Sequence, residues 1–344
     1  MQHINLNILD EQTAHKFYVS GLGAVVNKPS TNDRQLHVNF GVSQFHLLLK
    51  YSAIDAIKPV TAAQVWSGSI ELWTKESLDV TESRLKGLEK LDVHLERPSK
   101  DCLKVRCPWG NQFVLREEIP PFNKSWGSHP SGSGTLASMP RVVHYVRPGA
   151  ASRLHAFWTT TMGAACELQP SGTPARWSAF DAQRDDPQAS AASDGASDGL
   201  LQCVVHFNTE PQQLVFAESR SAPSHDAYEH SEAVAYHICV YHPDEEGFRA
   251  CFDAWDAAGL LYANPVFARS PPQFGNALTW EEVEACGQFR IKDLGGGGHS
   301  KEAAALVLEL EIRSPKHVSC PLGKQAVAQS GANDANGSKK RARE

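Results

Sequence analysis

The sequence lacks the features that would tie it to a membrane or to nucleic acid. No stretch of its 344 residues approaches the roughly 18 consecutive apolar residues that a membrane-spanning helix needs. Lysine and arginine number 33 against 39 aspartates and glutamates, a formal net charge of −6, whereas nucleic-acid binding favours a basic face. We therefore expect neither a membrane nor a nucleic acid as partner. The length predicts a soluble protein of about two domains.

The eight cysteines lack the C-x-x-C spacing of redox and zinc motifs. The opening residues, MQHINLNILD, lack the basic flank, apolar stretch and small-residue cleavage site of a signal peptide. We therefore expect reduced thiols and a cytoplasmic location. The basic stretch KKRARE is also compatible with nuclear import, but a solvated, disordered tail over residues 324–344 is the simpler interpretation.

One short internal repeat organises the chain. FYVSGLGA begins at Phe17 and FWTTTMGA at Phe157, and the aromatic pair, the glycine and the alanine match without a gap. Each copy follows a strand pattern and precedes further strand patterns. Residues 119–141 between them are rich in Pro, Gly and Ser without periodicity, so they predict a linker. The predicted division is a first domain over residues 1–119, a linker over 120–140, a second domain over 141–323 and the tail over 324–344.

Each half divides again into units that run strand, helix, strands. In the first half, SGSIELWT predicts a strand, LDVTESRLKGLEKL a helix, and LKVRCPWGNQFVLRE two strands about a turn at Gly110–Asn111. In the second half, VAYHICVY predicts a strand and PDEEGFRACFDAWDAAGLL a helix, and GQFRIKDL and ALVLELEIRS predict two more strands. Residues 169–200 predict a loop insertion. The chain thus contains four units in two pairs.

Polar residues interrupt four predicted strands of the second half: His144 in RVVHYV, Glu218 in QLVFAES, His237 in VAYHICVY and Glu309 in LVLELEI. Carboxylates are costly inside a sheet unless they are paired or bound to a cation. Two imidazoles and two carboxylates on one concave sheet would suit Zn²⁺, Ni²⁺, Co²⁺ or Fe²⁺. The alternative is that each is an isolated core or surface residue. In that case Glu218, and Glu311 two residues after Glu309, simply face water.

The repeated unit, the FY…LGA echo and the CPWGNQF turn resemble the vicinal oxygen chelate superfamily, which includes glyoxalase I, extradiol dioxygenases and bleomycin-resistance proteins. The resemblance covers the chain except its linker, insertions and tail. It departs from the family's D-P-x-G-N turn in having Cys107 where the family has Asp. The resemblance implies an α+β fold of four βαβββ modules, paired into two curved mixed-sheet domains that cup one metal.

In that family the metal ligands lie on the first and last strands of two paired modules. Carried over to this sequence, those positions are His144, Glu218, His237 and Glu309. In the first half, His3 and His46 occupy such positions, but the next module offers Ser69 and either Val114 or Arg116. The resemblance therefore implies one divalent metal (Zn, Ni, Co or Fe) in the second half and a degenerate first half.

Three functions remain open on this basis. A Lewis-acidic metal with a glutamate base, Glu218 or Glu309, suits glyoxalase I-like isomerisation or lyase chemistry on a small oxygen-chelating substrate. An extradiol-type Fe(II) dioxygenase would use only His144, His237 and Glu309, although the Tyr, Asp-Pro and Gly that precede the ligand Glu in that family are missing here. A non-catalytic protein that binds a small molecule is the third. The extra Glu218 favours the isomerase, and we expect a monomer or homodimer.

Overall fold

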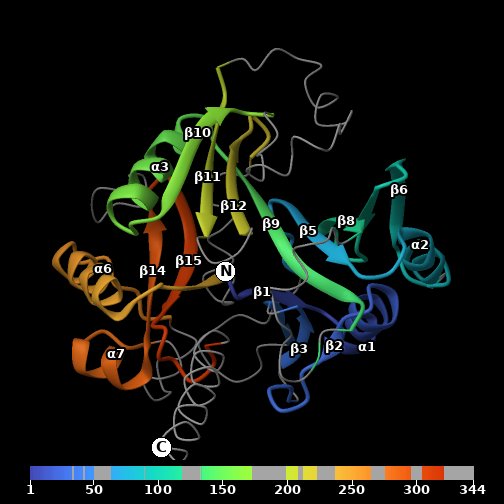
Figure 1. The fold of residues 1–344 in the computed structure, drawn as a ribbon, viewed down its shortest axis with the longest axis horizontal. Coiled ribbons are helices and arrows are strands. Elements are labelled where there is room, and N and C mark those ends of the chain that lie inside the picture. The colour runs from blue at the N-terminus through green and yellow to red at the C-terminus, as the bar shows by residue number, and fades with distance from the viewer. Residues whose placement is uncertain are drawn as a thin grey trace, which may run out of the picture.

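The computed structural model describes residues 1–32, 35–41, 43–49, 63–88, 90–117, 132, 134–172, 199–207, 212–222, 237–264, 276–295 and 304–320. Its strands form two mixed sheets (Figure 1). The order is β14-β15-β13-β1-β4-β3-β2 in the 7-stranded sheet and β10-β11-β12-β9-β5-β8-β7-β6 in the 8-stranded sheet. The α+β class with paired modules in two mixed sheets, predicted from the resemblance, is confirmed. The tail predicted over residues 324–344 and most of the predicted insertion lie outside the described residues.

The first two modules follow the predicted order of elements. Module one comprises β1 (His3–Ile8), α1 (Glu11–Ala14), the π-helix η1 (His15–Gly21), β2 (Val25–Val26), β3 (Gln35–Phe40) and β4 (Ser43–Leu49). Module two comprises β5 (Gly68–Thr74), α2 (Leu78–Lys86), β6 (His94–Ser99), β7 (Cys102–Arg106) and β8 (Gln112–Glu117). Asp10 begins α1 because its carboxylate accepts hydrogen bonds from the amides of Gln12 and Thr13.

The last two modules repeat that order with one change. Module three comprises β9 (Leu136–Val146), α3 (Ala150–Thr160), β10 (Ala165–Pro170), β11 (Leu201–Phe207) and β12 (Gln212–Glu218). Module four comprises β13 (His237–Tyr241), α6 (Glu245–Ala257), α7 (Trp280–Cys286), β14 (Gln288–Leu294) and β15 (Leu306–Arg313). Among its described residues, a single bridge from Leu261 to Ile291 stands where the other modules have a further strand.

The modules do not pair in the order of the sequence. β1 lies antiparallel to β13, with His3 opposite Cys239, so modules one and four share the 7-stranded sheet. β5 lies antiparallel to β9, with Ile70 opposite Val142, so modules two and three share the other. The expected pairing of modules on each side of the linker is therefore wrong. The predicted linker also extends too far, because β9 begins at Leu136.

A common apolar core joins the two sheets. Tyr18 of η1 packs between Phe45 of β4 and Phe113 of β8, with ring centroids 5.4 and 6.0 Å away. The helix α3 packs on β10 and β11, and α7 packs on β14 (Figure 1). Within the described residues, no helix is long and apolar enough to cross a membrane. In the 7-stranded sheet the core takes one face, and the polar residues of β1 and β15 lie on the other.

Candidate metal centre

The 7-stranded sheet carries a polar cluster on the face turned away from the core. On β1 the apolar side chains point into the core, and alternation therefore places His3, Asn5 and Asn7 on the opposite face. Strand pairing brings His237 of β13 opposite Asn5, and Glu309 of β15 opposite His237. Two modules far apart in sequence thus contribute polar groups to one surface.

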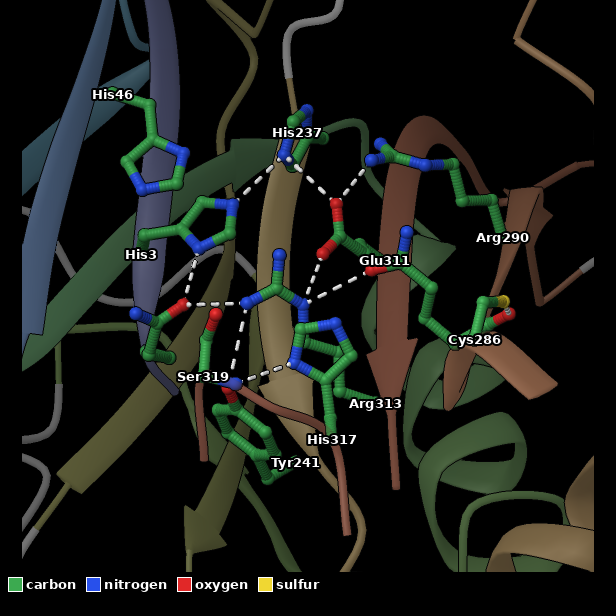
Figure 2. A network of polar contacts seen from close by, with 12 residues as sticks. His3, His46, His237, Tyr241, Cys286, Arg290, Glu311, Arg313, His317 and Ser319 are labelled. Atoms are coloured by element: carbon green, nitrogen blue, oxygen red, sulfur yellow. Dashed lines mark hydrogen bonds and ion pairs between the residues drawn. The ribbon is translucent and has the colours of Figure 1, made fainter. Parts of the chain in front are cut away.

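His3 and His237 meet at the centre of this cluster (Figure 2). Their Nε2 atoms lie 3.0 Å apart, and the two side chains are almost fully buried. The Nε2 atom of Gln2 donates to Gln44 Oε1 at 3.1 Å, which turns the oxygen of the Gln2 amide toward His3 Nδ1. Nδ1 of His3 therefore carries the proton and donates, and the lone pair of Nε2 faces His237.

Two further histidines stack beside His3. The ring centroids of His3 and His46 lie 3.7 Å apart, and those of His46 and His37 lie 3.9 Å apart. Burial, followed by the neighbouring imidazole, lowers the pKa of His3 and of His46 well below the usual value. Both rings are therefore neutral near pH 7, which is the form that binds metals. His46 donates its Nε2 proton to Gln44 at 3.1 Å, so that atom is engaged elsewhere.

Glu311 supplies the carboxylate nearest the histidines. Its Oε2 lies 3.4 Å from His237 Nε2, and Arg290 and Arg313 form ion pairs with its two oxygens (Figure 2). Burial alone would raise the pKa of Glu311, but these two guanidinium groups hold it far below the usual range. Glu311 is therefore an anion that the two arginines hold against His237.

Glu309 lies on the same face but is engaged differently. It forms an ion pair with Arg290 and accepts a hydrogen bond of 2.8 Å from Asn264 Nδ2. Burial raises the pKa of Glu309 despite the attraction of Arg290. The carboxylate nearest the histidines is thus Glu311, which follows the predicted ligand Glu309 by two residues on β15.

The donor atoms of His3, His237 and Glu311 suit one divalent cation. Ligands bound to a tetrahedral ion at 2.0–2.1 Å are about 3.3 Å apart. Here His237 Nε2 lies 3.0 Å from His3 Nε2 and 3.4 Å from Glu311 Oε2. Sγ of Cys239 also lies within 4.8 Å of ligand atoms of His3 and Glu311. Imidazole nitrogens and an ionised carboxylate are ligands that Zn²⁺ and Fe²⁺ accept. The residues therefore fit such an ion.

The charge balance of the cluster restricts what binds with the cation. Arg290 and Arg313 already offset the charges of Glu309 and Glu311, so a divalent ion adds positive charge in a buried place. Uncompensated buried charge is costly. An anionic oxygen ligand that binds the same ion would offset that charge.

His144 and Glu218 lie in the other sheet and point toward its core. His144 of β9 packs edge-on against Trp66, with ring centroids 4.9 Å apart, and Nδ1 donates to the carbonyl of Tyr145 at 3.0 Å. Burial lowers the pKa of His144 to about 4. Glu218 of β12 accepts hydrogen bonds of 3.0 Å from the amides of Ala151, in the first turn of α3, and Leu201. Both side chains are buried and hydrogen-bonded within the fold, so Glu218 does not face water.

The predicted set is divided between the two sheets, with His144 and Glu218 in the 8-stranded sheet and His237 and Glu309 in the 7-stranded sheet. The structure instead brings together His3 and His237, with Glu311 as the carboxylate. His3 was recognisable from its place on the first strand of a module. Glu311 was missed as a ligand, although its alternation with Glu309 indicated a shared face.

The corresponding strands of the 8-stranded sheet hold a different group. There Glu71 of β5 lies 3.7 Å from Arg116 of β8 and 3.7 Å from Arg141 of β9, and it accepts a hydrogen bond from Trp73 Nε1. Guanidinium groups occupy the places that imidazoles hold in the first sheet. Two guanidinium groups beside one carboxylate give these three residues a net positive charge.

No protein-family model and no curated protein matches the chain. Solved structures do resemble it. A candidate dioxygenase from Bacillus subtilis has a TM-score of 0.49 at 10% identity, over 93% of this chain and 86% of that one. Glyoxalase I from Zea mays has a TM-score of 0.48 at 11% identity, over 91% and 92%. A glyoxalase/bleomycin resistance protein/dioxygenase superfamily member from Sphaerobacter thermophilus has a TM-score of 0.24 at 25% identity, over 34% and 96%.

These neighbours carry the names of the group that the sequence resembles, the vicinal oxygen chelate superfamily. All three TM-scores lie below 0.5. No reaction or substrate therefore transfers from them to this chain.

Proposed function

We propose that the protein is a metal-dependent enzyme that acts on a small oxygen-chelating molecule by extradiol-type dioxygenation of a catechol. His3, His237 and Glu311 would hold one Fe²⁺. The observation that supports this most is that His237 Nε2 lies 3.0 Å from His3 Nε2 and 3.4 Å from Glu311 Oε2. Two histidines and one carboxylate are the ligand set of non-haem Fe(II) oxygenases.

The residues around the ligands have definable tasks in this proposal. A bound Fe²⁺ supplies redox chemistry and polarises two adjacent substrate oxygens. Arg290 and Arg313 act as positioning residues, because they orient Glu311 and keep it ionised. Gln2 fixes the tautomer of His3. The same two arginines favour a substrate that binds as an oxygen anion, since that anion offsets the charge of the cation.

Glyoxalase I-like isomerisation is the second candidate, and one observation favours it. Glu309 lies directly opposite His237, and burial raises its pKa, as suits a carboxylate that acts as a base. Glu218, the other base considered, is engaged at the start of α3. An isomerase would therefore depend on Glu309 alone.

The test is oxygen consumption by the full chain. The protein is loaded with Fe²⁺ under anaerobic conditions and then mixed with catechol in aerated buffer. Its metal content is measured by mass spectrometry. We expect one iron per chain and oxygen uptake that His3→Ala and His237→Ala abolish. His94→Ala is the matched control, because His94 is exposed and paired with Asp92. This variant should keep both the bound iron and the oxygen uptake.

Other outcomes separate the alternatives. Turnover of a glutathione-linked 2-oxoaldehyde with Zn²⁺ or Ni²⁺, without oxygen and lost in Glu309→Gln, would favour the isomerase. Metal binding with neither activity would favour a binding protein. Absence of metal from the wild-type chain would contradict the proposal. The cytoplasmic location and the monomeric or dimeric state stay predictions.

A further inference from the structure

Asn7 of β1 has a buried side chain that forms no hydrogen bond with any residue that the structure describes. The residue is 2% exposed, and neither its Oδ1 nor its Nδ2 atom has a partner within the described part of the chain. A buried amide without partners is costly, because it loses its bonds to water and gains none in return. Such a group in a native structure needs an explanation.

Two hydrogen bonds hold the backbone of Asn7, so the point on β1 from which its side chain projects is fixed. Its amide donates to Gln64 Oε1 at 2.9 Å, and its carbonyl accepts from the amide of Gln64 at 3.0 Å. Leu48 of β4 lies opposite Asn7 and is also buried. The carboxamide therefore stands at a fixed point beside an apolar neighbour.

That fixed point belongs to the face of the metal centre. Asn7 follows Asn5 by two residues, and Asn5 is the residue opposite His237. Two residues along a strand span about 7 Å. A molecule that reaches the imidazoles of His3 and His237 and extends by the width of one ring along β1 would therefore meet Asn7.

We propose that Asn7 recognises a carboxamide on the substrate, about 7 Å along the strand from the histidines that hold the metal. This inference rests on the proposed function and names the substrate class as an amide-substituted oxygen chelator. The Asn7 side chain offers a donor and an acceptor side by side. A second amide satisfies both at once, whereas a carboxylate leaves Oδ1 unpaired and an ammonium leaves Nδ2 unpaired.

The first test compares two catechols that differ at one substituent. The full chain is loaded with Zn²⁺, which is redox-inert, and titrated in a calorimeter with 3,4-dihydroxybenzamide and with 4-methylcatechol. We expect the wild type to prefer the benzamide by about tenfold or more, the effect of two added hydrogen bonds. Asn7→Leu should remove that preference and leave the affinity for 4-methylcatechol unchanged.

The second test needs neither metal nor ligand. Leu removes the unpaired amide from the core, so Asn7→Leu should raise the urea midpoint of the metal-free protein. Asn39→Leu is the matched control. Asn39 is equally buried on the same sheet, but it accepts from Gln44 at 2.6 Å and donates to the carbonyl of Gly132 at 3.2 Å. That variant should lower the midpoint.

Each outcome decides the inference. Equal affinity of the wild type for both catechols overturns it and leaves the proposed function standing. If neither catechol binds, the proposed function fails and the stability comparison decides alone. A lowered midpoint in Asn7→Leu then assigns Asn7 a structural role and overturns the inference, and a raised midpoint supports a group retained for a ligand.

Discussion

Two buried glutamates make different contacts because of their positions in the fold. Glu311 faces two histidines, whereas Glu218 accepts backbone hydrogen bonds from Ala151 and Leu201. Glu218→Gln keeps an acceptor but loses the negative charge at the start of α3. We expect a loss of about 1–2 kcal/mol in the free energy of unfolding, measured by urea denaturation. Metal content should stay at the wild-type level; a metal-free variant of normal stability would contradict this assignment.

His144 should make the protein sensitive to acid. Its pKa is about 4 in the folded chain and 6.5 in the unfolded chain, so the unfolded chain binds the proton first as pH falls. Stability should therefore decrease from about pH 6.5 and reach the full loss near pH 4, on the order of 3 kcal/mol for this group. Urea denaturation of wild type and His144→Gln over this range measures the effect. The wild type should show the steeper dependence, and identical slopes would count against a buried neutral imidazole.

The sequence was better at identifying which residues have ligand-forming side chains than at showing which face of a strand those side chains occupy. His237 and His3 were both recognised as positions that bind metal in the resembling family. His144 was assigned to the ligand set because the more exposed face of β9 carries Val143 and Tyr145, which are as apolar as Val142 and Val146 on the buried face. Such a strand shows no alternation of polar and apolar residues that would tell which face a histidine takes.

At the scale of elements, the turn between β3 and β4 fixes how the two sheets approach each other. Gly41 there has φ of +58°, and a Cβ atom would lie 1.9 Å from the carbonyl oxygen of Ala137 on β9. We expect Gly41→Ala to destabilise the fold by more than about 2 kcal/mol, since strain and a backbone clash add.

Gly149→Ala is the matched control for that prediction. Gly149 has φ of +84°, and a Cβ atom there meets nothing within 4 Å among the described residues. Only the conformational cost of about 1 kcal/mol remains. Thermal unfolding of both variants measures the difference, and equal losses would show that Ala137 moves aside.

Sequence patterns predicted most helices, strands and turns, because these elements depend on residues that are close together in the sequence. HINLNI became β1, and PDEEGFRACFDAWDAAGLL contains α6, whose first turn is capped by Asp244. The predicted turn at Gly110–Asn111 separates β7 and β8. The predicted linker was too long because a Met-Pro pair concealed the start of β9, where the strand is identified only by its pairing with β5.

At the scale of the whole molecule, the metal centre requires both halves of the chain. His3 lies in module one, and His237 and Glu311 lie in module four. Residues 141–323 expressed alone should therefore bind no stoichiometric metal, whereas the full chain should bind one ion. Mass spectrometry of both proteins measures this. One ion per fragment would show that module four suffices, and the full chain with His3→Ala should behave like the fragment.

Which module pairs with which could not be predicted from the sequence. Pairing is a contact between strands that are far apart along the chain, and all four modules present similar first strands. Hydrophobic pattern identifies a strand but not its neighbour. The prediction assumed that sequential units are adjacent, which is the common case, and the pairing of β1 with β13 is the exception here.

The pairing of β1 with β13 also sets an order of events during folding. Modules two and three are consecutive, so their sheet closes short loops. The sheet of modules one and four joins residues such as His3 and His237 that are 234 positions apart. Contacts of such separation form late, because the chain between them must first be ordered. During synthesis, β1 therefore exposes an unpaired edge until module four leaves the ribosome, and chaperone binding should concentrate on that interval.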